Sequence, residues 1–177
     1  MRIIGGKYRG KTIIPPTNFT ARPTTDFAKE AIFTMLINTF NFENLSVLDL
    51  FSGTGSISYE FCSRDCKKLV AVENDTNHAK FIRNQFEILN FQQATLINID
   101  VFKYLKNCKE KFDIIFADPP YQLENIEEIY HLVIDNQLLT PDSWLIIEHS
   151  DKINLSDLPF FMKKKQYGSV NFSIFEL

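Results

Sequence analysis

Residues 112–121 read Phe-Asp-Ile-Ile-Phe-Ala-Asp-Pro-Pro-Tyr. The mostly apolar run 112–117 predicts a buried strand, and the two prolines end it because proline has no N–H to give to a sheet. Asp118 and Tyr121 therefore stand close together in a turn stiffened by Pro119 and Pro120. A flat, amine-bearing substrate would fit there, with N–H bonds to the carboxylate and the Pro119 carbonyl and its face on the Tyr121 ring. Asp and Pro also form ordinary turns, so this stretch alone leaves both interpretations open.

Strands and helices alternate on either side of this stretch. Apolar runs predict further strands, and periodic segments predict helices between them. The expected strands are 46–51, 68–73, 94–99, 112–117, 143–148, 160–165 and 170–176, and the expected helices are 56–63, 77–90, 101–105 and 124–136. This order predicts an α/β, Rossmann-like fold with a mostly parallel seven-stranded sheet. The short turn around Tyr167-Gly168 makes the last two strands an antiparallel terminal hairpin.

The first 45 residues precede this alternation. Residues 2–14 predict a glycine-rich β-hairpin, and residues 18–23 a linking loop. A helix then begins at Thr24-Thr25-Asp26, where a threonine can cap it. Its apolar stripe (Phe27/Ala28, Ala31/Ile32, Met35/Leu36) should pack on the sheet. We expect residues 1–177 to form one domain: 1–23 as a basic hairpin and loop, 24–45 as a packing helix and connection, and 46–177 as the catalytic core.

Composition narrows the class of protein. The 177 residues are 45% hydrophobic and 23% charged, as in ordinary globular proteins, and no apolar run approaches a membrane span. No signal-like apolar core follows Met1, so a cytoplasmic location without membrane contact is expected. Cys62, Cys66 and Cys108 form no Cys-x-x-Cys pair and the histidines are scattered, so we expect neither a disulfide framework nor a metal site.

The net charge of −3 hides a basic N-terminus. No acidic residue occurs before Asp26, and the first 25 residues contain Arg2, Lys7, Arg9, Lys11 and Arg22. A second basic run is Lys163-Lys164-Lys165. A locally basic face on an acidic protein is compatible with a docked polyanion such as RNA, and a solvated basic hairpin is the alternative.

Polar residues follow four of the expected strands, at the edge where ligands bind in such sheets. They are Asp49 with the loop Gly53-Thr54-Gly55, then Glu73, Asp100 and Asp118. The loop lacks the third glycine of a dinucleotide site, because Ser58 occupies that position. The sequence therefore does not require a pyrophosphate-binding loop here. Glu73 lies 20 residues after Gly53, the spacing of an acid that accepts hydrogen bonds from ribose hydroxyls. With Asp100 near an adenine amine and Asp49 toward an ammonium group, this pattern fits S-adenosylmethionine. An ordinary βα turn is the alternative for the glycine loop alone.

The chain resembles class I methyltransferases, and Asp118-Pro119-Pro120-Tyr121 resembles the signature of those that methylate exocyclic base amines. Over essentially its whole length the chain resembles the RsmD family, bacterial 16S rRNA guanine-N2 methyltransferases. That resemblance rests on residues 2–11, on 22–26 with Glu30, on 49–55 and on 165–168. Three residues depart from the family pattern: Ser52 and Thr54 stand where Ala and Ser are usual, and Phe27 stands where Arg usually follows the acid.

The resemblance implies transfer of a methyl group from S-adenosylmethionine to a guanine N2 in 16S rRNA. The substrate would be the small ribosomal subunit or its assembly intermediate. The transfer itself needs no metal, and a monomer is the default expectation. The implied catalytic residues are Asp118, Pro119, Pro120 and Tyr121. The implied cofactor contacts are Asp49, Phe51, Gly53, Gly55, Glu73, Asn74, Asp100 and Val101. The implied RNA contacts are Arg2, Lys7, Arg9, Lys11 and Arg22.

Three other functions remain open at this point. An adenine-N6 methyltransferase would use the same tetrapeptide, but no insertion here is long enough for an added target-recognition region. A nicotinamide-dependent oxidoreductase is opposed by the missing third glycine. An inactive RNA-binding assembly factor is opposed by the intact Asp118 and glycine loop.

Overall fold

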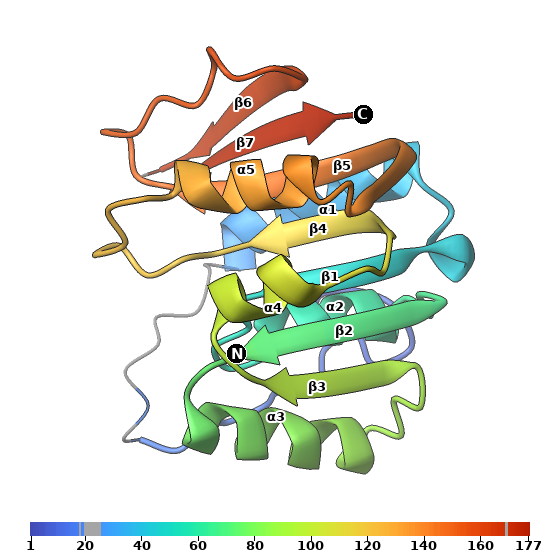
Figure 1. The fold of residues 1–177 in the computed structure, drawn as a ribbon. Coiled ribbons are helices and arrows are strands. Elements are labelled where there is room, and N and C mark those ends of the chain that lie inside the picture. The colour runs from blue at the N-terminus through green and yellow to red at the C-terminus, as the bar shows by residue number, and fades with distance from the viewer. Residues whose placement is uncertain (18, 20–25, 169) are drawn as a thin grey trace.

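The computed structural model describes residues 1–17, 19, 26–168 and 170–177. Within them, seven strands form one sheet in the order β3-β2-β1-β4-β5-β7-β6 (Figure 1). The strands are β1 (Ser46–Leu50), β2 (Lys68–Glu73), β3 (Ala94–Asn98), β4 (Phe112–Ala117), β5 (Leu139–His149), β6 (Phe161–Tyr167) and β7 (Val170–Glu176). β1 to β5 pair in parallel, and β7 pairs antiparallel with both β5 and β6. The expected mostly parallel sheet with an antiparallel terminal hairpin is confirmed.

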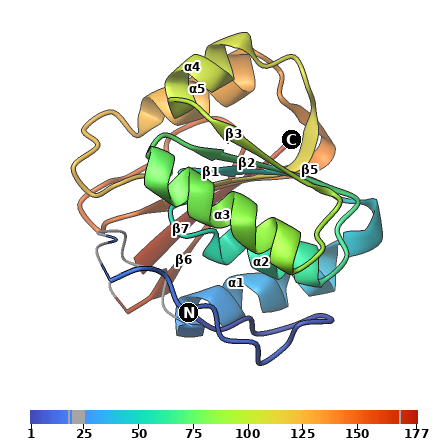
Figure 2. The same cartoon turned by 90° about the horizontal axis from the view of Figure 1, so that it is seen from below.

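Helices cover both faces of the sheet, as Figure 2 shows from below. One face carries α1 (Asp26–Thr39), α2 (Ser56–Ser63) and α3 (Thr76–Ile88), and the other carries α4 (Val101–Asn107) and α5 (Glu127–Asp135). A short 3-10 helix, η1 (Phe42–Asn44), joins α1 to β1. Each face has its own apolar cluster. Among the described residues, no helix combines the length and apolarity needed to cross a membrane.

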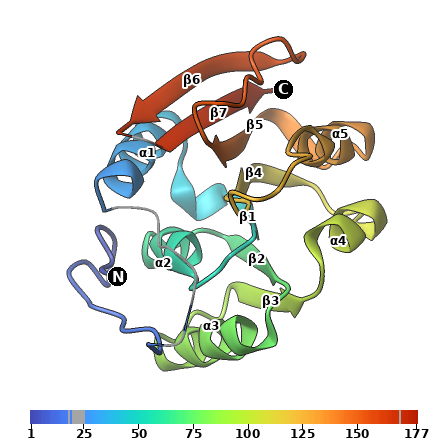
Figure 3. The same ribbon diagram turned by 90° about the vertical axis from the view of Figure 1, so that its left-hand side faces the viewer.

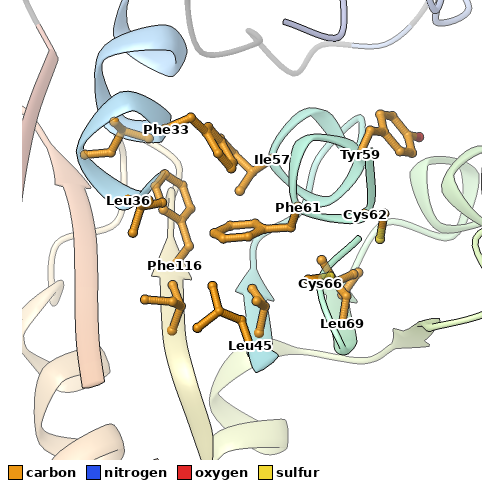
Figure 4. Packing of buried hydrophobic residues seen from close by; sticks show 14 of the residues in the cluster. Phe33, Leu36, Leu45, Ile57, Tyr59, Phe61, Cys62, Cys66, Leu69 and Phe116 are labelled. Atoms are coloured by element: carbon orange, nitrogen blue, oxygen red, sulfur yellow. The ribbon is translucent and has the colours of Figure 1, made fainter. Parts of the chain in front are cut away.

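Phenylalanine rings fill the cluster beneath α1 and α2. Phe61 of α2 lies between the two helices, with its ring centroid 4.8 Å from that of Phe33 on α1 and 5.8 Å from that of Phe42 (Figure 4). Aromatic contacts of this kind add to the free energy of simple area burial. They hold α1 firmly against the core, which matters because the start of α1 lies at the edge that carries the site.

Two elements begin three or more residues away from the predicted start, while the other shifts among the predicted strands and the four predicted helices of the core are one or two residues. β5 begins at Leu139 instead of 143, because Phe112 pairs with Leu139 before the register shifts and Ile114 pairs with Trp144. Asp142 in the extra stretch has a φ of 59°, so the chain bulges there before the regular pairing. α5 begins at Glu127 instead of 124. The bounds of β2, β4 and β7 agree with the prediction.

The N-terminal segment (residues 1–14) pairs antiparallel over a short stretch, in agreement with the predicted hairpin. Arg2 bridges Thr12, and backbone N–H···O bonds of 2.9 Å join residue 1 to residue 13 and residue 3 to residue 11. The loop between the paired ends docks on α2, where the Lys7 N–H donates to the Ser63 carbonyl at 2.7 Å and the Tyr8 N–H donates to the Ser63 hydroxyl at 3.0 Å. Tertiary hydrogen bonds thus satisfy backbone groups of the loop that the short pairing does not reach.

α1 differs from its prediction in one exposed ring. Ala28, Ile32 and Leu36 are buried as expected, but Phe27 is 69% exposed. The predicted threonine cap and the predicted loop 18–23 fall on or beside residues 18 and 20–25, which lie outside the described residues.

A buried ion pair joins α1 to α2. Lys29 is 1% exposed and Glu60 is 0% exposed, and the Lys29 Nζ lies 3.0 Å from the Glu60 Oε1. The same ammonium donates to the Arg2 carbonyl at 2.7 Å and to the Ser56 hydroxyl at 3.2 Å. Arg64 binds the other Glu60 oxygen. One charged group thereby holds the N-terminal segment, α1 and the start of α2 together.

Gly6 and Gly10 offer a matched test of this docking. Both have positive φ (74° and 85°), but a Cβ on Gly6 would lie 1.8 Å from the Ser63 carbonyl oxygen, while nothing lies within 4 Å of one on Gly10. Gly10→Ala should cost about 1 kcal/mol of backbone strain. Gly6→Ala should cost several times more, because it also breaks the hydrogen bonds to Ser63, each worth about 1 kcal/mol.

Urea unfolding measures this difference, and trypsin cleavage at Lys7, Arg9 and Lys11 reports whether the segment has come away from α2. Equal losses for the two variants would contradict the docking.

Candidate active site

The carboxyl ends of β1, β2 and β4 open into a cavity of about 1230 Å³. Figure 3 looks onto this edge of the sheet. The cavity collects all the predicted catalytic and cofactor-binding residues except Gly55. Its lining includes Asp49, Phe51, Gly53, Glu73, Asn74, Asp100, Val101, Asp118, Pro119, Pro120 and Tyr121.

The loop after β1 is built from left-handed residues. Phe51, Gly53 and Gly55 have φ values of 58°, 56° and 84°. A Cβ on Gly55 would lie 2.5 Å from the ring of Tyr59, so glycine is required there even though it does not line the cavity. Ser58, at the position of the missing third glycine, donates its hydroxyl hydrogen to the Asp49 carboxylate at 2.5 Å. At the position where a dinucleotide site has its third glycine, this chain therefore carries a side chain that binds Asp49.

Glu73 clamps this loop to the end of β2. Its Oε2 accepts from the Gly53 N–H at 2.7 Å, and its Oε1 accepts from the Asp75 N–H at 2.8 Å. A carboxylate has about four acceptor sites, so both oxygens retain capacity for a ligand's hydroxyls.

Asp100 caps the start of α4. Its Oδ1 accepts from the Lys103 N–H at 3.0 Å, which leaves the second oxygen at the cavity wall. Val101 is buried beside it, and the Asn74 carbonyl accepts from the Asn98 side chain at 2.9 Å. These strand ends are thus rigid before any ligand arrives.

Asp49 has an unusual titration. The pKa of its carboxyl is raised from 3.8 to about 7. Burial is the largest cause, the negative charges of Asp118 and Glu73 add to it, and the Ser58 hydroxyl opposes the shift. Carboxylates that crowd a buried site create a negative potential. The cavity is therefore suited to a ligand that carries positive charge.

The Asp118–Tyr121 turn lies at the rim of the same cavity. The Asp118 N–H donates to the Leu50 carbonyl at 3.5 Å, and the Leu123 N–H donates to the Pro120 carbonyl at 2.8 Å. These bonds close the turn on both sides of the prolines. Tyr121 is 64% exposed, so its ring is accessible to a large substrate.

The predicted RNA contacts lie apart from the cavity lining. Arg2 is 3.7 Å from Asp26 and Lys7 is 2.8 Å from Asp65, whose hydrogen bond raises the pKa of the Lys7 ammonium. Arg9 and Lys11 are exposed. Arg22 lies outside the described residues.

The N-terminal segment runs along α2 from the cavity toward the opposite edge of the sheet. The Met1 Sδ lies 3.8 Å from the Thr54 hydroxyl in the cavity wall, whereas the Tyr8 hydroxyl donates to the carbonyl of Leu89, just past the end of α3. Its basic residues are therefore spread over that distance. Among the described residues, no group of three or more His, Cys, Asp or Glu side chains is placed to hold a metal ion.

Sequence reasoning missed Lys29 and Ser56. Ser56 lines the cavity at the start of α2 and accepts from the Lys29 ammonium, which connects the cavity to the buried ion pair. A lysine inside the apolar stripe of a predicted helix, between Ala28 and Ile32, was the available signal because buried lysine needs a partner.

Comparisons with known proteins agree with this geometry. A family model described as conserved hypothetical protein 95, the RsmD family, matches residues 1–176. This chain belongs to the RsmD family. Similar relatives of known name are the ribosomal RNA small subunit methyltransferase D of Haemophilus influenzae, 29% identical over 182 residues, and the putative rRNA methyltransferase YlbH of Bacillus subtilis, 27% identical over 183 residues. The matches cover 99% of this chain in both cases, and 93% and 98% of the two relatives.

A solved structure supports the same assignment. The putative methyltransferase yhhF from Escherichia coli superposes with a TM-score of 0.86 at 26% identity, covering 99% of this chain and 97% of that one. The fold of this RsmD-family member is therefore that of a class I methyltransferase, as its sequence indicates.

The Asp49 titration predicts a pH-dependent stability in this RsmD-family protein. The unfolded chain loses the Asp49 proton near pH 3.8 and the folded chain near pH 7, so the folded state binds more protons between these values and stability falls as pH rises. Asn cannot ionise, so Asp49→Asn should be more stable than the parent by as much as roughly 4 kcal/mol at about pH 8.

That gain should shrink as the pH falls and approach zero below about pH 3, where Asp49 is protonated in both states. Urea unfolding at several pH values measures it, with Asp151→Asn at an exposed position as control. A gain that does not change with pH would refute the burial argument.

Proposed function

We propose that this protein transfers a methyl group from S-adenosylmethionine to the exocyclic N2 amine of a guanine in 16S rRNA of the small ribosomal subunit or its assembly intermediate. One observation carries the proposal: the Asp118–Tyr121 turn and the carboxylate-lined cavity behind β1 and β2 are parts of one site. A base on the turn and a cationic donor in the cavity would therefore meet. Membership of the RsmD family and the names of the relatives support RNA as the substrate.

The cavity residues fit this cofactor. S-adenosylmethionine carries a sulfonium and an ammonium group, which the negative potential around Asp49 favours. The acceptor capacity left on Glu73 suits the two ribose hydroxyls, and the second oxygen of Asp100 suits the adenine amine. Pyrophosphate would be repelled by the same carboxylates, which speaks against a nicotinamide dinucleotide.

The Asp118 carboxylate and the Pro119 carbonyl prepare the amine for attack. The nitrogen lone pair of a guanine N2 is delocalised into the ring, which makes it a poor nucleophile. Two fixed acceptors for its N–H bonds favour a tetrahedral nitrogen whose lone pair faces the cavity, and fixed acceptors need no reorganisation during the reaction. When bound, the cofactor supplies an electrophilic methyl group. The turn adds the orientation that brings nitrogen and methyl into line.

Two further steps are binding of the base by Tyr121 and loss of a proton from the methylated nitrogen. The exposed ring can stack on the base, a contact worth roughly 1–3 kcal/mol. The methylated nitrogen is positively charged and acidic, so Asp118 need not be a strong base to take its proton. The guanine must be unstacked or already exposed in the RNA to reach the turn.

Asp118→Ala should lower methyl transfer by about a thousandfold, because it removes a fixed charged acceptor. Affinity for S-adenosylmethionine should change little. Tritium transfer to small-subunit RNA measures the first quantity and calorimetry the second, with Asp118→Asn as an isosteric comparison. Lost cofactor binding would contradict the assigned role, and transfer to adenine in duplex DNA would favour an adenine-N6 methyltransferase instead.

Arg9 and Lys11, both exposed on the N-terminal segment, should contact RNA phosphates. Replacing both with alanine should weaken RNA binding and flatten the plot of log affinity against log salt by about 1.4–1.8, as expected for two lost phosphate contacts. The control is Lys109→Ala/Lys111→Ala, which removes the same charge from exposed positions before β4. An equal change in both double variants would contradict a specific role for the segment.

A further inference from the structure

The surface formed by the terminal strands β6 and β7 also reaches the edge of the sheet that carries the site. β7 runs antiparallel to β5, so Asn171 near its start pairs with His149 at the end of β5. Tyr167, the last residue of β6, pairs with Val170. The end of β6 therefore lies at the edge where β4 ends and the Asp118 turn begins, as Figure 1 shows.

The first turn of α1 meets β6 at this edge. Lys29, one turn into the helix, bonds to Ser56 in the cavity wall, which places the start of α1 beside the opening. Phe27 lies 5.9 Å from Tyr167 between ring centroids, with the rings at 81°. Figure 3 shows the start of α1 next to the end of β6.

One ring of this pair is anchored in the core, and the other is exposed to solvent. Tyr167 also contacts the fully buried Phe172, at 6.2 Å between centroids. Phe27, in contrast, remains 69% exposed despite its contact with Tyr167. An edge-to-face pair leaves the face of the outer ring available, and a large ring this exposed contributes little to the core.

Lysines continue the surface along β6. Lys165 pairs with Phe172 and Lys163 with Ile174, both in the core cluster beneath α1. Residues directly opposite on neighbouring strands share a face, so Lys163 and Lys165 lie on the α1 side with Tyr167. Lys164 points to the other face. Two residues along a strand span about 6.7 Å, the scale of the step between phosphates in an extended nucleic-acid strand.

We propose that Phe27, Tyr167, Lys163 and Lys165 form an RNA-binding flank that holds the rRNA strand adjoining the target guanine. A neighbouring base stacks on Phe27, and the phosphates continue along β6 over the lysines. This deepens the proposed function and rests on it. The ring pair is continuous with the site opening, the polar groups of the four residues themselves are basic or phenolic, and base stacking on aromatic rings is tolerant of sequence.

Phe27→Ala should lower affinity for a fluorescein-labelled single-stranded RNA about tenfold, within the range of one lost stacked base. Phe27→Leu should lose as much, because it keeps apolar area without a π face, and Phe27→Trp should retain affinity. S-adenosylmethionine binding should be unchanged in all three. Phe160→Ala is the matched control, since this ring is 52% exposed immediately before β6, at the opposite edge of the sheet.

Tryptophan fluorescence tests whether the RNA contacts position 27 directly. The native Trp144 is 2% exposed, so an added indole at position 27 reports on the surface. The RNA should quench Phe27→Trp saturably and leave Phe160→Trp unaffected. Unchanged affinity in Phe27→Ala together with no quenching in Phe27→Trp would overturn the flank.

Variants of two neighbouring lysines test which face of β6 contacts the RNA. Lys165→Ala should flatten the salt dependence of RNA binding by about 0.7, as for one contact on a single strand, while Lys164→Ala should not. A parent-like slope in Lys165→Ala would place no phosphate on the α1 side, and an equal flattening in both variants would contradict a preference for that face.

Methyl transfer by the parent protein to 16S rRNA is measured separately. If the parent methylates the RNA and Phe27→Ala does so with unchanged KM, the flank is wrong and the proposed function stands. If the parent binds RNA through Phe27 but transfers no methyl group, the flank stands and the proposed function is wrong.

Discussion

The burial of acidic groups is the constraint on which the site depends. β1, β2 and β4 are neighbouring parallel strands, so their ends deliver Asp49, Glu73 and Asp118 to one cavity whether or not the charges are compatible. Burial and the two neighbouring charges raise the pKa of Asp49 to about 7. A fold optimised for stability alone would place apolar residues there. The retained acids make sense as one half of an interaction whose other half is a cation, and the remaining geometry of the site follows from holding them in place.

The rigidity of the site has two sources. Glu73 fixes the glycine loop through the Gly53 N–H, and the buried pair of Lys29 and Glu60 fixes the start of α2 through Ser56. Removing one partner from a buried pair typically costs several kcal/mol because the other charge is left uncompensated. Lys29 also binds the Arg2 carbonyl. The N-terminal segment and the cavity wall are therefore held by one ammonium group, although the segment belongs to a different part of the chain.

Local sequence patterns were sufficient to predict elements whose limits depend on neighbouring residues alone. The limits of β2 and β4 agree with prediction because apolar runs bounded by turn residues have few alternatives. The strand-end residues were likewise predictable from topology, since parallel strands end together. Long-range contacts were not accessible in this way. The sequence indicated the N-terminal hairpin, but not that its loop docks on Ser63 of α2 and on the Leu89 carbonyl. The helix stripe placed Phe27 inside, because periodicity cannot show that the first turn of α1 lies at the edge of the sheet, where Phe27 stays 69% exposed beside Tyr167.

The position of β7 has a consequence for how the sheet is completed. β6 is made before β7 but pairs with the sheet through it, since β7 lies between β5 and β6. Until residues 170–176 have left the ribosome, the apolar strand β5 presents an unpaired edge, and β6 has no place to attach. A newly made chain is therefore open to strand pairing with another molecule late in its synthesis, and early termination within β7 would leave that edge permanently uncovered.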